Sequence, residues 1–231
     1  MYRLLYTIKL LCAIFFASSC SNEYIVKGST CDIFDGANIY IKTLIDGRWE
    51  AIDSCEILHG KFMMEGEADS TFISAIFIGN EAVIPIVIEE GNINVDIEMH
   101  NVTINGTQLN DKLSHFFNKK YYYEQQIMDL ERKEASMILE GHTNKEDYIA
   151  IQDQIAEIGN SINFFIEEFI KEHYENVLGP CVFQLWCNGM PYPTINEQIG
   201  RILKEAPEVF LSDTYVKEFM AAAEKNSNKD N

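Results

Sequence analysis

The sequence predicts an α+β protein. An N-terminal antiparallel β-sandwich or open barrel is followed by a long antiparallel αα-hairpin and short C-terminal helices. Three observations support this prediction: apolar and polar residues alternate between 24 and 107, apolar residues recur at steps of three and four between 109 and 169, and helix-capping residues follow 176. Apolar residues make up 47% of the 231-residue chain, which is enough for a substantial core.

About seven or eight short strands are expected between residues 24 and 107. Alternation is clearest from 92 to 99, where every second residue is apolar. Residues 71–78 and 83–88 are apolar on both faces, which is typical of central strands in a packed sheet. Glu90-Gly91-Asn92 predicts a hairpin turn between segment 83–88 and the alternating segment that ends at 99. Strands at this spacing favour a small antiparallel sandwich or open barrel.

Two long helices are expected after Gly106, where the apolar period changes. In the second helix one stripe of apolar residues, which we call the seam, steps by three and four without interruption: Tyr148, Ile151, Ile155, Ile158, Ile162, Phe165 and Phe169. The first helix keeps the same register from Leu109 to Met137, with polar breaks at Lys120 and Glu134. The sequence therefore predicts two helices packed along one seam.

The loop between these helices has the residues of a tight connection. Gly141 suits a left-handed helix C-cap, and Thr143 and Glu146 have the spacing of a capping box. We therefore predict an antiparallel αα-hairpin over residues 108–175, roughly 45 Å long at 1.5 Å per residue.

Residues 176–231 predict a C-terminal helical segment with a frayed tail. Thr194 and Glu197 form a second capping-box pattern, and Ser212-Asp213 is expected to cap the last helix. The polar stretch from Lys225 to Asn231 is expected to fray.

Residues 1–19 have the three parts of a secretory signal peptide. Arg3 and Lys9 are basic, residues 10–16 are apolar, and the small residues 17–19 precede Cys20. Small residues that end on a cysteine resemble the bacterial lipobox, in which the thiol receives a diacylglycerol and becomes the new N-terminus. This resemblance predicts lipidation at Cys20 and a lipid-anchored β-sandwich domain over residues 20–107.

Short motifs of the β half carry a further resemblance. They are Asp53-Ser54, Gly60-Lys61-Phe62, Gly66, Ile86-Val87-Ile88-Glu89-Glu90-Gly91, Asn105-Gly106-Thr107 and Asn110-Asp111. Their order is similar to that in the domain-of-unknown-function family 4369 (DUF4369), found at the N-terminus of Bacteroidota thioredoxin-like lipoproteins. There a lipobox precedes the domain and a helical segment follows. The resemblance implies a fold and a cell-envelope location, and it implies no known activity.

The sequence departs from these relatives after the hairpin. Many of them continue into a thioredoxin fold with a Trp-Cys-x-x-Cys site, whereas Met190 here takes the place of the second cysteine after Trp186-Cys187. The residues beyond Met190 predict helices instead of the strands that such a fold needs. We therefore expect no thioredoxin domain. By family analogy, Ser21 and the single acid in residues 21–23 favour an outer-membrane location facing the periplasm.

Four cysteines remain in the mature chain: Cys31, Cys55, Cys181 and Cys187. An even number in an oxidising compartment permits disulfides, and four buried free thiols are the alternative. Cys181 and Cys187 are six residues apart, about 9 Å along a regular helix, and this exceeds the roughly 7 Å limit for a disulfide. No redox-active disulfide is expected between these two.

Charge and motifs disfavour several classes of function. The net charge of −18 repels phosphate backbones, so no nucleic-acid partner is expected. The five histidines are at no metal-ligand spacing, and no nucleophile elbow, P-loop or dinucleotide fingerprint occurs. We therefore expect no metal site, no cofactor and no enzymatic activity.

The favoured function is a lipid-anchored, non-enzymatic binding or scaffolding module of the cell envelope, anchored to the membrane at Cys20 and contacting an envelope protein partner. An accessory protein in periplasmic thiol-disulfide exchange, using Cys181 and Cys187, is the alternative. A third hypothesis is a glycan-binding sandwich, in which Trp49 beside Arg48 stacks on a sugar.

Overall fold

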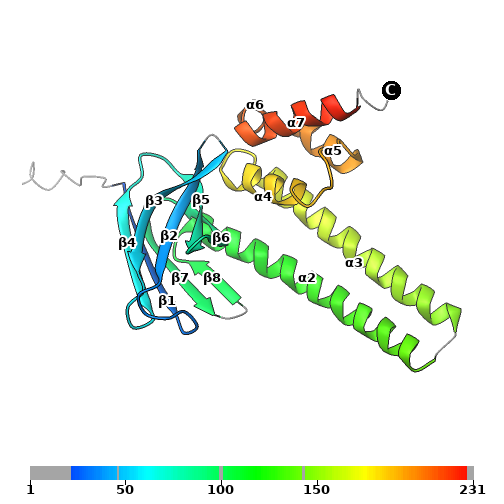
Figure 1. Cartoon of the computed structure of the whole chain (residues 1–231). Helices are drawn as coiled ribbons and strands as arrows, with labels where there is room; N and C mark the ends of the chain where they lie inside the picture. Colours follow the sequence, from blue (N-terminus) through cyan, green and yellow to red (C-terminus); the bar gives the residue numbers. More distant parts are fainter. Residues whose placement is uncertain (1–21, 46, 99–100, 142–143, 228–231) are drawn as a thin grey trace, which may run out of the picture.

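The computed structural model describes residues 22–45, 47–98, 101–141 and 144–227. Eight strands form two four-stranded sheets, and helices follow them, which confirms the predicted α+β class (Figure 1). The strands are β1 (Glu23–Thr30), β2 (Asn38–Ile45), β3 (Arg48–Glu56), β4 (Lys61–Glu67), β5 (Phe72–Ile78), β6 (Glu81–Ile88), β7 (Gly91–Glu98) and β8 (Asn101–Asn105).

The strand order is β4-β1-β7-β8 in one sheet and β3-β2-β5-β6 in the other, so the described strands form two sheets instead of a closed barrel. The expectation of purely antiparallel pairing is wrong for β1 and β7, which run parallel, with Tyr24 opposite Gly91 and Thr30 opposite Ile97. A parallel pair has no connecting hairpin, so no local turn signal in the sequence marks it.

The core of the sandwich consists of the inward-facing residues of the alternating strands. Val26, Ile39, Ile41, Ile93 and Val95 are all fully buried there. Burial of each such side chain contributes about 1.5–3 kcal/mol to stability. The predicted alternation therefore corresponds to one inner face per sheet.

Strand β6 is apolar on both faces for a reason that the sequence does not show. It is an edge strand of its sheet, not the central strand that we expected. Ile86 and Ile88 face the sandwich core, whereas Val87 faces a second core formed with the helices. The turn at 90–92 carries the chain from one sheet to the other instead of forming a hairpin, because β6 and β7 belong to different sheets.

The helical half is a long hairpin with four shorter helices packed near its base. The helices are α2 (Gln108–Leu139), α3 (Lys145–Glu172), α4 (Leu178–Cys187), α5 (Glu197–Glu205), α6 (Glu208–Leu211) and α7 (Thr214–Ser227). Figure 1 shows α2 and α3 side by side, projecting far beyond the sandwich, with α4 to α7 gathered beside the sheet end of α3. None of the described helices is both long and apolar enough to cross a bilayer.

The seam is less buried than a continuous core would be. Ile151 and Phe169 are buried, but Tyr148, Ile155, Ile158, Ile162 and Phe165 are only half-buried. The short helices α4 and α5 cover the hairpin near its base, whereas its distal half consists of two helices with no third layer, and Ile151 is the buried seam residue there (Figure 1). The distal hairpin is therefore unusually open for an apolar stripe of this length.

Both predicted capping boxes are replaced by asparagine caps. Asn144 accepts a hydrogen bond from the Glu146 backbone N–H at the start of α3, and Thr143 lies outside the described residues. Asn196 caps α5 through the backbone N–H of Ile199, so Thr194 is not the cap. A capping side chain accepts from a backbone N–H two or three residues farther along the chain. Spacing alone therefore did not tell whether the threonine or the nearby asparagine would be the cap.

Other helix-end predictions are partly met. Gly141 adopts the predicted positive φ of 75° after α2. Asp213 Oδ1 accepts from the backbone N–H groups of Tyr215 and Val216 at the start of α7. Fraying was predicted from Lys225 onward, but α7 continues to Ser227, so the prediction is wrong for residues 225–227. Residues 228–231 lie outside the described residues.

The sandwich and the hairpin meet at a set of hydrogen bonds that we call the joint, formed by Glu89, Gly106, Thr107, Asn110 and Asp111. Fully buried Asn110 accepts from the Val87 backbone N–H at 2.9 Å and donates to the Val87 carbonyl at 2.8 Å and to Thr107 Oγ1 at 2.8 Å. It therefore pairs with β6 as another strand would.

The rest of the joint orients the first turn of α2. Glu89 Oε1 accepts from the backbone N–H of Leu109 at 2.9 Å, and its charge favours the positive end of the helix dipole. Asp111 accepts from the Gly106 N–H at 2.8 Å. Gly106 has a φ of 105°, and a Cβ there would overlap the Asn92 carbonyl oxygen. These residues belong to the motifs at 86–91, 105–107 and 110–111 that carried part of the family resemblance, so these three motifs form the attachment of the hairpin.

A buried ion-pair cluster holds α5 to α3. Glu167 is 5% exposed and accepts from Arg201 at 3.1 and 2.7 Å and from Lys171 at 3.1 Å. Lys171 also contacts Glu205 at 2.9 Å, and the two carboxylates raise the Lys171 pKa to about 12. Hydrogen bonds from Arg201 and then Lys171 hold the pKa of the Glu167 carboxyl below its usual value, although burial opposes this shift.

This cluster predicts a pH-dependent contribution to stability. Because the folded-state pKa of Glu167 is lowered, its stabilisation is complete above the unfolded-state pKa and is lost as the pH falls through the folded-state pKa. We expect Glu167→Gln to lower the free energy of unfolding by about 2 kcal/mol at pH 7 and by much less in acid. Urea unfolding between pH 7 and pH 3 measures this difference, and exposed Glu168→Gln is the control. Equal pH dependence in wild type and Glu167→Gln would contradict the assignment.

Candidate functional site

A hollow with a volume of about 1000 Å³ lies between α2 and α3, near the base of the hairpin. We call it the hairpin groove. Its lining residues are Asp111, Lys112, His115, Lys119 and Tyr123 from α2, and Glu157, Asn160, Ser161, Phe164, Phe165, Glu168, Phe169, Glu172 and His173 from α3 and its C-cap. Along α3 the lining extends over about 24 Å at 1.5 Å per residue.

The heptad register places these side chains on one side of the hairpin. Lys112 and Lys119 directly precede the seam positions Leu113 and Lys120. Each residue turns a helix by about 100°, so residues that precede seam positions lie together on one flank of the seam. Glu168 precedes the seam residue Phe169 in the same way on the antiparallel helix. The groove therefore follows one flank of the seam.

Aromatic rings form the floor of the groove. Phe116 stacks on Phe165 at 5.3 Å between ring centroids and contacts Phe169 at 4.6 Å. Tyr123 lies 6.4 Å from Phe165. Phe164, beside this floor, is 66% exposed to solvent, although rings of this size are usually buried in a monomer. Of the rings that line the groove, Phe164 thus offers apolar surface that no part of the described chain covers, whereas Phe165 is half-buried and Phe169 is buried.

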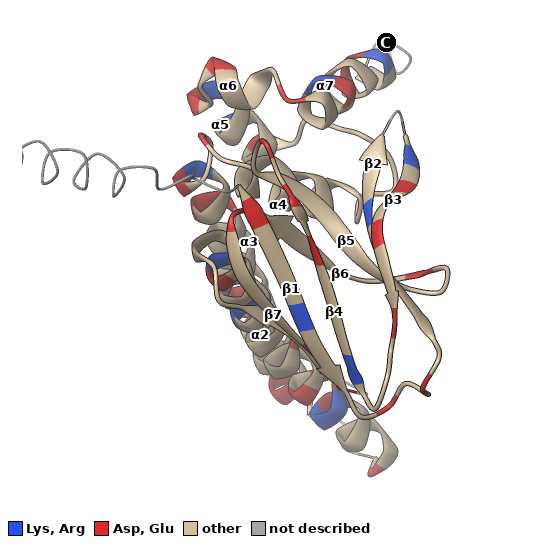
Figure 2. Ribbon diagram, turned by 90° about the vertical axis from the view of Figure 1, so that its left-hand side faces the viewer, with Lys and Arg blue, Asp and Glu red and all other residues tan. Residues whose placement is uncertain are grey.

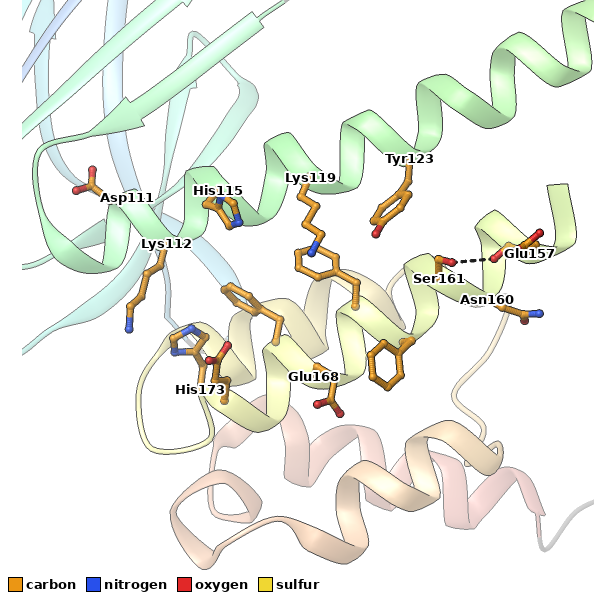
Figure 3. A pocket seen from close by; sticks show the side chains of 14 residues that line it. Asp111, Lys112, His115, Lys119, Tyr123, Glu157, Asn160, Ser161, Glu168 and His173 are labelled. Carbon is orange, nitrogen blue, oxygen red and sulfur yellow. Dashed lines mark hydrogen bonds between the residues drawn. The ribbon is translucent and has the colours of Figure 1, made fainter. Parts of the chain in front are cut away.

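The edge of the groove on α2 is cationic. Figure 3 shows Lys112, His115 and Lys119 extending from α2 toward α3. Lys119 Nζ lies 4.4 Å from the centroid of the Phe165 ring, in a cation–π contact. Among the described residues, neither Lys112 nor Lys119 forms an ion pair with a carboxylate. Unpaired cations along one edge are unexpected in a chain with a net charge of −18.

The edge on α3 is acidic. Glu157, Glu168 and Glu172 lie along it, and within the described part of the chain none of them forms an ion pair. Figure 2 shows basic and acidic residues along the helices, α2 and α3 among them, and scattered charges on the strands. The groove therefore has an apolar floor between two edges of opposite charge.

His173 closes the base of the groove in a fixed neutral form. Asn176 Oδ1 accepts from the Leu178 N–H at 3.0 Å, which orients its amide nitrogen toward His173 Nδ1, also at 3.0 Å. Nδ1 therefore accepts, and the neutral ring carries its proton on Nε2. Burial, with a further contribution from the charge of Lys112, lowers the His173 pKa, so the ring does not add to the cationic edge at neutral pH.

The polar groups of the groove suit binding. The Ser161 hydroxyl donates to the Glu157 backbone carbonyl at 3.0 Å, as the dashed line in Figure 3 marks, so it is engaged with backbone and not with a general base. No group of three histidine, cysteine or carboxylate side chains in the described residues is arranged to hold a metal ion. The groove can hold an amphipathic ligand by its floor and its edges.

The site residues predicted from the sequence lie elsewhere. Cys20 and residues 1–19 are outside the described residues. Cys31, Cys55, Cys181 and Cys187 are free thiols in this structure. Cys31 is exposed and donates to Asp32 Oδ2 at 3.3 Å, and Cys55 is partly buried against the sandwich core. The structure brings none of these side chains into the groove.

The two cysteines of α4 are buried, which disfavours their reactive thiolate forms. Burial raises the pKa of the Cys181 and Cys187 thiols to about 12 each. Exchange chemistry needs the thiolate, which is scarce at neutral pH when the pKa is this high. Trp49, the candidate for sugar stacking, is 49% exposed and packs edge-on against Phe77 at 5.1 Å between centroids.

Sequence reasoning missed the groove because it depends on two helices that are far apart in sequence. One local signal was present: Phe164 stands beside the seam residue Phe165 and so cannot share its packing environment. Lys120 and Glu134 were noted as breaks in the seam, whereas Lys112 and Lys119, the cations of the groove edge, lie just outside it. A large apolar residue beside the seam, such as Phe164, was therefore the local signal that could have indicated the groove.

Comparison with known families matches residues 24–113 to a family described as a domain of unknown function (DUF4369). This match confirms the resemblance predicted from the motifs. It covers the sandwich and the joint, and it ends inside α2, so most of the hairpin groove lies beyond it. No curated protein matches the chain.

Proposed function

We propose that the protein is a non-enzymatic binding module of the cell envelope, lipid-anchored at Cys20 in the outer membrane and facing the periplasm, in which the hairpin groove holds a helical segment of a partner protein. The sandwich gives the hairpin a rigid base through the joint. One observation carries this proposal: the exposed ring of Phe164 and the half-buried ring of Phe165 lie between a cationic and an acidic edge, all on one side of the hairpin.

A helix is the ligand that fits this surface best. The groove follows α3 and its C-cap for about 24 Å, which is the length of about 16 helical residues, and it follows α2 for about 18 Å. A third helix laid along two others buries an apolar stripe, as in helix-in-groove recognition. Acidic residues on one flank would face Lys112, His115 and Lys119, and basic residues on the other flank would face Glu157 and Glu168.

The two alternatives have less support. Thiol–disulfide exchange would need reactive thiolates, whereas Cys181 and Cys187 are buried and their thiols have pKa values of about 12. Glycan binding would rest on Trp49, whose ring already packs against Phe77 at 5.1 Å between centroids. Neither alternative uses the hairpin groove.

A designed peptide tests the proposal. The probe is an 18-residue amphipathic helix with leucines at heptad spacing, glutamates on one flank and lysines on the other, labelled for fluorescence anisotropy. We expect it to bind the purified protein, and we expect Phe164→Asp to weaken the affinity at least tenfold, because a charge would replace the exposed ring of the floor. Phe34→Asp, at a 77% exposed site on the sandwich, is the matched control and should bind as wild type does.

Two results would contradict the proposal. One is equal binding of a scrambled peptide of the same composition, which would indicate non-specific adhesion. The other is unchanged affinity of the Phe164→Asp protein, provided that its far-UV circular dichroism and thermal midpoint match those of wild type.

A further inference from the structure

The base of the hairpin groove holds a buried hydrogen-bond donor that the described chain does not use. His173 is only 4% exposed, and its Nδ1 accepts from Asn176, so the neutral ring carries its proton on Nε2. No described group accepts from Nε2, and this atom is not sealed from solvent, so it opens into the groove that His173 lines. Buried polar groups in proteins are nearly always hydrogen-bonded, so an open donor on a buried ring indicates a ligand.

A second donor, the ammonium of Lys112, lies close to the first. Lys112 is exposed near the start of α2, and within the described part of the chain it pairs with no carboxylate. Figure 3 shows its side chain extending toward the end of α3 that carries His173. Its charge also contributes to the lowered pKa of His173, as expected for neighbouring groups. We call these two donors the base subsite.

Two acids border the base subsite and limit what it can hold. Asp111 is partly engaged at the joint, where its Oδ1 accepts from the Gly106 N–H at 2.8 Å. Glu172 lies on the α3 edge of the groove, and its charge opposes the binding of a free anion. The base subsite therefore suits acceptor atoms that carry only partial charge.

The distal end of the groove has the opposite character. Glu157 and Asn160 from α3 and Tyr123 from α2 line it. The Glu157 side chain is exposed, and among the described residues its carboxylate forms no ion pair. Lys119 lies one turn closer to the base, with its ammonium over the Phe165 ring. The groove therefore offers donors at its base and a carboxylate at its distal end.

We propose that the bound helix lies in the groove in one direction, parallel to α3, with its C-terminal turn in the base subsite and its N-terminal turn beside Glu157. This inference rests on the proposed function. The last four carbonyls of a helix have no partner within it, and they carry the negative end of the helix dipole, so they accept from Lys112 and His173. The unpaired N–H groups at the other end of the helix face Glu157.

This direction specifies the chemistry of the partner segment. Lysine and arginine are favoured in the last turn of a helix, and a cation there would face Glu172 on the α3 edge. Acidic residues would lie on the flank that faces α2. The two flanks of a helix exchange places when its direction is reversed, so a partner with the opposite arrangement of flanks could match both edges only with the wrong end at the base.

Two peptides of identical composition test the direction. Both are 18-residue helices with blocked ends, leucines at heptad spacing, glutamates on one flank and lysines on the other. In the forward peptide the glutamates face α2 when the peptide lies parallel to α3. In the reverse peptide the flanks are exchanged, so its charges match the edges only when it lies antiparallel to α3. We expect the forward peptide to bind the purified protein about tenfold more tightly in fluorescence anisotropy.

Variants of the base subsite should reduce this preference. Lys112→Met removes the ammonium at an exposed position, and His173→Asn removes the Nε2–H while keeping an acceptor for Asn176. Each should lower the ratio of forward to reverse affinity to about three. Lys119→Met is the matched control, because it removes a cation from the same edge away from the base. It should weaken both peptides alike and leave the ratio unchanged, as any purely structural effect would.

The outcomes separate this inference from the proposed function. Equal affinities of the two peptides, or a ratio that Lys112→Met leaves unchanged, would overturn the direction while the groove still binds a helix. If neither peptide bound, the proposed function would be wrong and the inference with it. Lys112→Met decides alone if His173→Asn lowers the thermal midpoint. A photoreactive benzoylphenylalanine at the C-terminus of the forward peptide should cross-link to residues 169–173, and cross-links to residues 157–161 instead would equally overturn the inference.

Discussion

Asn110→Ala is expected to lower the free energy of unfolding by about 3 kcal/mol, because it leaves the Val87 N–H and the Val87 carbonyl without partners. Val87 and Asn110 are both fully buried, so water cannot replace the lost hydrogen bonds. The Thr107 hydroxyl loses its partner as well. Urea unfolding followed by far-UV circular dichroism measures the change.

Two further variants test whether the loss of stability in Asn110→Ala comes from the hydrogen bonds to Val87. Asn110→Asp keeps an acceptor for the Val87 N–H but cannot donate to the Val87 carbonyl, and it buries a charge, so we expect it to destabilise at least as much. Gln108→Ala changes an exposed side chain in the same helical turn and should alter stability by less than about 0.5 kcal/mol. If Asn110→Ala matched Gln108→Ala, the joint would not attach the hairpin as described.

Cys20→Ser is expected to move the protein from the membrane to the soluble fraction. Stable anchoring requires more than one acyl chain, and lipidation of Cys20 would supply all of them at one residue. Fractionation of cells by ultracentrifugation, followed by immunodetection, measures the distribution. The expected effect is nearly complete, because the acyl chains on Cys20 are the membrane anchor that we propose.

Cys31→Ser is the matched control for this experiment. Cys31 is the next cysteine along the sequence and its thiol is exposed, so its loss should leave the protein with the membranes. Retention of Cys20→Ser in the membrane pellet after a high-salt wash would contradict the lipoprotein assignment.

Much of the fold could be predicted because the relevant signals are local. The alternation between Asn92 and Met99 specifies a half-buried strand wherever that strand pairs, and β7 follows it closely. The seam from Tyr148 to Phe169 likewise specifies one apolar stripe, and α3 contains it whole. Gly141 marked the end of α2 because few other residues adopt a positive φ without strain.

The remainder depends on contacts between distant segments. Parallel pairing of β1 with β7 joins residues about 67 positions apart, and Ser29 donates to Asp96 across this pair at 2.6 Å. The role of Asn110 was hidden because an asparagine in a first helical turn is ordinary capping chemistry, and its partner Val87 lies in another element. The groove was hidden for the same reason, since its cationic and acidic edges belong to different helices.

A charge-swap experiment with the designed peptide tests the central claim most directly, namely that the hairpin groove binds a helix between two edges of opposite charge. Lys112→Glu/Lys119→Glu reverses the cationic edge. This variant should bind the original peptide at least tenfold more weakly than wild type, and it should recover affinity for a peptide with lysines on both flanks. If the reversed protein bound both peptides as wild type does, charge would play no part in recognition and the account of the groove would be wrong.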